Sequence, residues 1–173
     1  MRLPSVKAFS FLLITGLLVS CAGYRMGGQK PHALSKVKTI AVPMFRNNSL
    51  QPRAEALATS AVASALMQDG TYRIASIDKA DAILEGTVRS IKYSPLRGAR
   101  LDTLQSVELI NKVSIAWQLR DAKNPLKILA SGVASGGSQL FVSSNLQTSK
   151  NNALPEALER AGESLVSVLA NGY

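Results

Sequence analysis

The sequence is poor in the residues on which most enzymes and metal sites depend. Its 173 residues include one cysteine, Cys21, and one histidine, His32. A lone cysteine excludes an intramolecular disulfide and any multi-cysteine zinc or iron–sulfur site. His32 precedes the first expected strand, where a catalytic base would lack support, and no spacing singles out a pair of carboxylates typical of a glycosidase. The composition therefore favours a binding or structural protein, without a metal or other cofactor, over an enzyme.

Acidic residues are also scarce. The chain has 11 Asp and Glu against 20 Lys and Arg, which gives a formal net charge of +9. Hydrophobic residues make up 46% of the chain, too many for intrinsic disorder, and the length fits one domain. The basic surplus suits an anionic partner. Nucleic acid is not the expected one, because no motif combines aromatic and basic residues to stack bases.

The first 20 residues have the features of an export signal. Arg2 and Lys7 supply positive charge, and residues 8–19 follow without a charged side chain. This run is too short for a bilayer core, which needs roughly 20 apolar residues. We therefore expect residues 1–20 to be a signal peptide that is absent from the mature chain.

The end of this run, Leu-Val-Ser-Cys at residues 18–21, resembles the lipobox of bacterial lipoproteins. The resemblance implies cleavage before Cys21 and attachment of fatty acyl chains such as palmitate, and several chains together anchor a protein firmly. Ala22 stands where an Asp would retain a lipoprotein in the inner membrane, which implies the outer membrane. Residues 21–35 would then be the acylated cysteine and a tether. An ordinary secretory signal with a chance cysteine is the alternative.

Residues 36–173 have the patterns of a single α+β domain. β-branched residues dominate residues 37–42, which predicts a first strand that Pro43 ends. From Pro52 the apolar residues recur with helical spacing, and Gly70 suits the left-handed position after a helix. The expected apolar stripe of this helix consists of Ala54, Leu57, Ala58, Ala61, Val62, Ala65 and Leu66.

Several strands are expected next. Residues 72–75 predict a short strand, and residues 82–93 predict a longer one whose two faces are both mixed. The clearest alternation of apolar and polar residues is in residues 107–119, where only Asn111 interrupts the apolar face.

The last third of the chain predicts further strand structure and a helix. Residues 126–133 have the pattern of a strand, and two adjacent glycines, 136 and 137, suggest a bulge or break before residues 139–142. Asn151 or Asn152 can cap the final helix, with Pro155 in its first turn. The order is then β-α-β-β-β-β-α, a mixed sheet of four to five strands with two helices packed on one face.

The most local charge signal lies in residues 89–100, which contain four basic residues and no carboxylate. These are Arg89, Lys92, Arg97 and Arg100. Arg97 and Arg100 would lie at the tip of a hairpin, where guanidinium groups can bind phosphates in a bidentate manner. A solvated loop that protects strand edges is the alternative. Lys150, just ahead of the last expected helix, is open to the same two interpretations.

Three stretches of the chain resemble the lipopolysaccharide-assembly lipoprotein family, LptE. The first is the opening Cys-Ala-Gly-Tyr-Arg-Met-Gly of residues 21–27. The second combines the strand, turn and helix entry of residues 40–49 and 52–55 with Ala-Asp-Ala-Ile-Leu-Glu-Gly at residues 80–86. The third covers residues 146–150 and 153–158, at the entry to the last helix.

This resemblance implies a function without catalysis. A member of the family would lie inside the β-barrel of LptD, plug it, assist its assembly and bind lipopolysaccharide for insertion into the outer leaflet. The resemblance also implies basic residues that contact the glycolipid, matched here by Arg97 or Arg100 and by Lys150. One alternative is a lipid-anchored structural adaptor of another envelope complex. Another is a lipid-anchored hydrolase, which would need a deep pocket with a perturbed acid or base.

Overall fold

The computed structural model describes residues 30–96, 108–141 and 145–172. The expected signal peptide, Cys21 and the first part of the expected tether lie outside these residues, as do Arg97 and Arg100. The described elements, in chain order, are η1 (His32–Leu34), β1 (Thr39–Ala41), β2 (Arg46–Asn47), α2 (Ala54–Asp69), β3 (Arg73–Ile74), β4 (Ala82–Pro95), β5 (Glu108–Asp121), β6 (Ile128–Phe141) and α3 (Leu146–Asn171).

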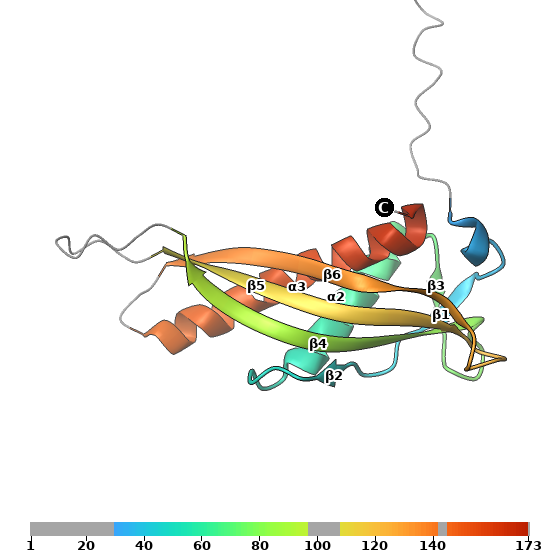
Figure 1. Cartoon of the computed structure of the whole chain (residues 1–173), viewed down its shortest axis with the longest axis horizontal. Helices are drawn as coiled ribbons and strands as arrows, with labels where there is room; N and C mark the ends of the chain where they lie inside the picture. Colours follow the sequence, from blue (N-terminus) through green and yellow to red (C-terminus); the bar gives the residue numbers. More distant parts are fainter. Residues whose placement is uncertain (1–29, 97–107, 142–144, 173) are drawn as a thin grey trace, which may run out of the picture.

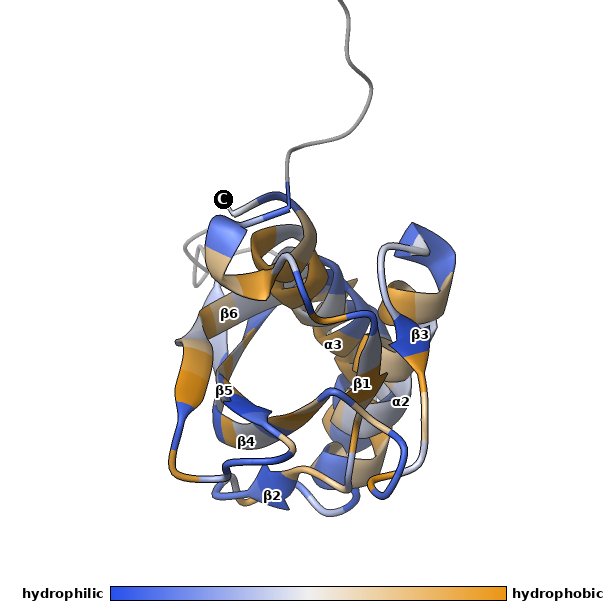
Figure 2. Cartoon of the chain, turned by 90° about the vertical axis from the view of Figure 1, so that its right-hand side faces the viewer, coloured by the Kyte–Doolittle hydropathy of each residue, from blue (hydrophilic) through white to orange (hydrophobic). Residues whose placement is uncertain are grey.

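One mixed sheet forms the framework of the domain. Its strand order is β3-β1-β4-β5-β6, and β2 also pairs with β4. The short strands pair in parallel, whereas β4, β5 and β6 form an antiparallel meander of 14 residues per strand. At about 3.3 Å per residue each long strand spans roughly 45 Å, so the sheet is elongated (Figure 1). Viewed end-on it is also strongly curved (Figure 2).

The two ends of this sheet differ. The short strands β1 and β3 pair near the start of β4, at one end. The other end is formed by residues 91–95, 108–113 and 136–141 of the three long strands, and we call it the hairpin end. There the meander extends beyond β1 and β3, and among the described elements only the first turns of α3 lie nearby (Figure 1).

The fold class is confirmed, and the sequence interpretation differs from the structure in the strand count. The protein is α+β, with a mixed sheet and two helices packed against it. A bulge or break was expected at the paired glycines before residues 139–142, but β6 runs unbroken from Ile128 to Phe141. Its paired glycines do not break it, because Gly136 stays in register with Val113 of β5. The short strand β2 is an addition to the expected set.

A β-bulge explains why residues 82–93 showed two mixed faces. The register of β4 against β5 shifts between Val88 and Ser90, which leaves Arg89 as the extra residue. Before the bulge, even-numbered residues such as Leu84 and Val88 are buried. After it the parity changes, and Ile91 packs against the core.

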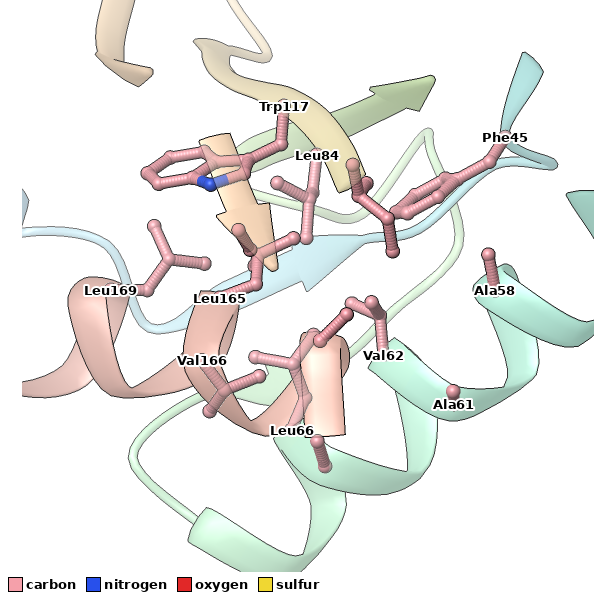
Figure 3. Packing of buried hydrophobic residues seen from close by; sticks show 14 of the residues in the cluster. Phe45, Ala58, Ala61, Val62, Leu66, Leu84, Trp117, Leu165, Val166 and Leu169 are labelled. Carbon is pink, nitrogen blue, oxygen red and sulfur yellow. The ribbon is translucent and has the colours of Figure 1, made fainter. Parts of the chain in front are cut away.

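The core lies between the sheet and the helices. Figure 3 shows Trp117 and Leu84 of the sheet together with Leu165 of α3 and Val62 of α2. The expected stripe of α2 is buried except for Leu57, which is 37% exposed, and Gly70 ends this helix in the left-handed conformation. Leu34 of η1 is also buried, so the core begins within the segment expected as a tether.

Close backbone contacts at two glycines bring the layers together. A Cβ atom on Gly136 would overlap the backbone oxygen of Ala157 in α3. Where the two helices cross, a Cβ on Gly162 would lie 3.2 Å from the backbone oxygen of Ala61. Because neither glycine has a side chain, α3 can lie directly on β6 and against α2.

The last helix begins earlier than expected. Asn145 caps it, because its side chain accepts a hydrogen bond from the Thr148 amide at 3.1 Å. The prediction of a cap at Asn151 or Asn152 is therefore wrong, and Pro155 lies inside the helix. An interior proline removes the amide that would bond the carbonyl of residue 151. Burial of Leu154 and neighbouring side chains against the sheet offsets this cost. None of the helices in the described part of the chain has the length and apolar character to span a membrane.

An exposed carboxylate joins the short strand β1 to the start of β4. Asp81 accepts hydrogen bonds from the Lys38 amide at 2.9 Å and from the Thr39 amide and hydroxyl, both at 3.0 Å. These hydrogen bonds, first among them that from the Lys38 amide, lower the pKa of Asp81. The carboxylate thus stays charged where β1 enters the sheet.

The contact at Gly136 generates a stability prediction. We expect Gly136→Ala to lower the free energy of unfolding by about 2 kcal/mol, because the helix backbone must move away from β6. Gly137→Ala is the matched control in the same strand. Its Cβ would lie 3.1 Å from the Asn111 backbone oxygen, whereas a Cβ on Gly136 would overlap the Ala157 oxygen. Chemical denaturation of both variants checks this. Equal stabilities would contradict direct contact between α3 and β6.

Candidate functional site

A row of polar side chains crosses the hairpin end on the face that α3 covers. Tyr93, Asn111 and Ser138 are direct partners in the registers of β4, β5 and β6. Ser138 is buried, and its hydroxyl donates a hydrogen bond to the Ala153 carbonyl at 2.6 Å. This bond ties the early part of α3 to β6.

The other two members of the row lack such bonds. Asn111 is 0% exposed, and neither its amide nitrogen nor its amide oxygen has a hydrogen-bond partner among the described residues. The buried hydroxyl of Tyr93 has none there either. Burial raises the pKa of Tyr93, so this phenol is uncharged at neutral pH. Unpaired buried polar groups are costly. Three of the four buried side-chain polar atoms without a partner among the described residues belong to Tyr93 and Asn111, and the fourth is Trp117 Nε1. The hairpin end therefore gives up stability at this row.

Lys150 contacts the Tyr93 end of this row. It lies inside α3, not ahead of the helix as expected, because the helix already begins at Leu146. Its Nζ lies 4.9 Å from the centroid of the Tyr93 ring, a cation–π contact. The structure thus brings one of the three expected glycolipid-contacting residues to the hairpin end.

The other two expected residues, Arg97 and Arg100, belong to the segment between β4 and β5 and lie outside the described residues. In the sequence they lie between the end of β4 at Pro95 and the start of β5 at Glu108.

Sequence reasoning did not identify Asn111 and Lys112 as residues of this site. Asn111 was noted only as an interruption of an apolar face, although it is buried beneath α3. The alternation in residues 107–119 places Lys112 on the polar face of its strand and predicts no partner for it. In the structure it is the register partner of Lys92, on the sheet face that the helices leave open. No signal in the sequence gives this pairing, since it depends on the bulge at Arg89.

Chemistry elsewhere in the described ranges is sparse. No group of three His, Cys, Asp or Glu side chains within residues 30–96, 108–141 and 145–172 could hold a metal ion. A hollow of about 380 Å³ beside Trp117 is lined by Glu85, whose carboxylate forms an ion pair with Arg120 at 2.9 Å. His32 begins η1, at the end of the domain opposite the hairpin end.

A family model matches most of the amino-acid sequence. The sequence model of LptE, described as lipopolysaccharide-assembly, matches residues 37–169. A search of curated proteins finds no match.

Solved structures are similar in fold. Protein XCC0632 from Xanthomonas campestris has 16% identity and a TM-score of 0.53, with 86% of this chain and 93% of that chain covered. The hypothetical protein CT253 from Chlamydia trachomatis has 10% identity and a TM-score of 0.53, with 75% and 94% covered.

The unpaired amide of Asn111 generates the second prediction. We expect Asn111→Leu to raise the free energy of unfolding by about 1–2 kcal/mol, because it replaces an unsatisfied buried amide with a side chain of similar size. Ser138→Ala is the matched comparison in the same row. It should lower stability by about 1 kcal/mol, since it removes the bond to Ala153. Thermal and chemical denaturation measure both, and a less stable Asn111→Leu variant would refute the prediction.

Proposed function

The chain belongs to the lipopolysaccharide-assembly family LptE, and from this premise we propose that it is an outer-membrane lipoprotein that plugs an LptD-type β-barrel, assists its assembly and binds lipopolysaccharide. The observation that carries the proposal is the extent of the family match, from residue 37 to residue 169. This range includes all three long strands and nearly all of α3. The LptE family is a non-catalytic assembly family, so binding and not bond chemistry is the function proposed here.

The shape of the domain supports a role inside a barrel. The long strands and α3 run along one axis and make the domain much longer than it is wide (Figure 1). A domain of this form can enter a lumen lengthwise, with the hairpin end leading or trailing. The edge strand β6 contains no charged residue along its 14 positions, so it brings no unpaired charge into a protein–protein contact.

The charges at the hairpin end support lipopolysaccharide binding. Lys150 lies over Tyr93 at the surface of this end, and Arg97 and Arg100 belong to the connection between its two strands. In the proposal these three residues contact lipid A phosphates, through charge-assisted hydrogen bonds.

The membrane anchor is a further part of the proposal. Cleavage before Cys21 and acylation of that residue would hold the domain at the inner surface of the outer membrane, joined by a glycine-rich tether of fewer than 20 residues. Mass spectrometry of the purified mature protein checks the acyl chains directly.

Depletion of the protein tests the proposed function. We expect loss of correctly assembled LptD-type barrel and of surface lipopolysaccharide, because the barrel would lack its plug during folding. Affinity purification of the full chain should recover a large outer-membrane barrel. Normal barrel assembly, or recovery of a soluble or inner-membrane complex instead, would support the structural adaptor and reject the plug.

A charge reversal tests the three basic residues. We expect Arg97→Glu, Arg100→Glu and Lys150→Glu together to weaken lipopolysaccharide binding at least tenfold, because repulsion replaces attraction to phosphate, and to leave the domain folded. The control is Lys36→Glu, Lys79→Glu and Lys123→Glu, the same charge change on exposed lysines at the opposite end of the domain. Binding titrations compare the two variants. Equal affinities would show that the three residues are solvated charges that do not contact lipopolysaccharide.

A further inference from the structure

Two lysines face each other on the open side of the sheet at the hairpin end. Lys92 of β4 and Lys112 of β5 are direct register partners. Their chain neighbours Tyr93 and Asn111 belong to the row beneath α3, so by strand alternation the two lysines point away from the helices. Both lysines are exposed.

The charges of this pair are not compensated by the part of the chain that the structure describes. Neither lysine forms an ion pair with a described carboxylate. On the same face, Glu85 is bonded to Arg120, and Glu108 lies four residues along β5, about 13 Å away. Like charges directly opposite on a sheet destabilise it. The free domain therefore bears a small cost that an anion between the two ammonium groups would remove.

A hollow lies directly beside the pair. Its volume is about 450 Å³, and it is open to solvent. The register partner of Lys112 on β6 is Gly137, which has no side chain to fill the space. The side chains that line it are Ser90, Lys92, Ile110, Lys112, Ser114 and Ser135. Ser90, Ser114 and Ser135 form the adjacent row across the three strands.

This lining defines the chemistry of a ligand. Cβ atoms of directly opposite residues are about 5 Å apart, and flexible lysine stems allow both ammonium groups to contact one phosphate. The serine hydroxyls can donate further hydrogen bonds. Ile110 and the lysine stems supply an apolar surface beside the charges. A phosphate attached to an acylated molecule satisfies all of these groups, whereas a single carboxylate on a protein would use fewer of the donors.

We propose that Lys92 and Lys112, with the hollow at Gly137, form a second binding site for the phosphate of an acylated glycolipid. The site rests on the proposed lipopolysaccharide-binding function and extends it to the open face of the sheet. It shares no residue with the expected set of Arg97, Arg100 and Lys150.

Binding of two lipids by the full, acylated chain in a nonionic detergent tests the site. The probes are purified lipopolysaccharide and the same lipopolysaccharide after removal of its lipid A phosphates. We expect Lys92→Gln with Lys112→Gln to weaken binding of the phosphorylated lipid about tenfold and to leave binding of the dephosphorylated lipid unchanged. The control, Lys79→Gln with Lys123→Gln, removes the same charge from the opposite end of the domain and should change neither affinity.

The stability of the free protein gives a second readout. Because the repulsion between the two lysines is relieved, Lys92→Gln with Lys112→Gln should raise the Tm by about 1 °C while it weakens binding. A solvated pair without a ligand would not combine these two effects. A lower Tm would show that the pair stabilises the sheet and would overturn the proposal.

The remaining outcomes separate this site from the proposed function. If the wild-type chain binds lipopolysaccharide and the open-face variant binds it equally well, the site is rejected and the function stands. If the wild-type chain binds no lipopolysaccharide, both are rejected. Equal binding of phosphatidylglycerol vesicles, with the same loss in the variant, would indicate a general contact with anionic lipid and would overturn the assignment to a glycolipid. Inorganic phosphate should compete at millimolar concentration, and a failure to compete would contradict recognition of phosphate.

Discussion

The direct contact between the backbone of α3 and strand β6 is the constraint on which the rest of the structure depends. Gly136 allows it, and two polar contacts reinforce it: Ser138 to the Ala153 carbonyl, and Arg160 to the Gly137 carbonyl at 2.8 Å. With 26 residues at 1.5 Å each, α3 spans roughly 39 Å, close to the length of the long strands. One helix therefore covers nearly the whole length of one sheet face, and the other face stays open.

The two ends of α3 are held by different contacts. Near its C-terminal end, the Tyr72 hydroxyl donates to the Leu169 carbonyl at 2.7 Å, and burial raises the pKa of Tyr72 to about 12. Lys30 lies over that ring at 4.1 Å. Near the other end, Lys150 lies over Tyr93 in a similar way, but this hydroxyl has no partner among the described residues. Three of the four buried polar side-chain atoms without a partner among the described residues thus lie at the hairpin end, near the proposed ligand contacts.

The sequence predicted those features that depend on one element alone. The buried stripe of α2 and the inward face of β5 follow from residue spacing, and both are confirmed. Features that depend on two elements were not accessible. The continuity of β6 at Gly136 is explained only by the helix packed on it, and the start of α3 at Asn145 was hidden by a proline that usually marks a first turn. The basic character of the hairpin end was visible, but the pairing of Lys92 with Lys112 requires the register after the bulge.

The distribution of charge differs between the helical layer and the open face of the sheet. The helix α2 carries Glu55 and Asp69 and no basic residue, and the groove between α2 and α3 is lined by Glu159 and Glu163. An anion near this layer would meet carboxylates, whereas the open face at the hairpin end presents the uncompensated pair of lysines. Since α3 fixes which sheet face is covered, the same packing that builds the core also decides which face an anionic ligand can approach. A basic chain with few carboxylates can bind an anion selectively in this way, because carboxylates line the groove between the helices whereas the paired lysines lie on the open sheet.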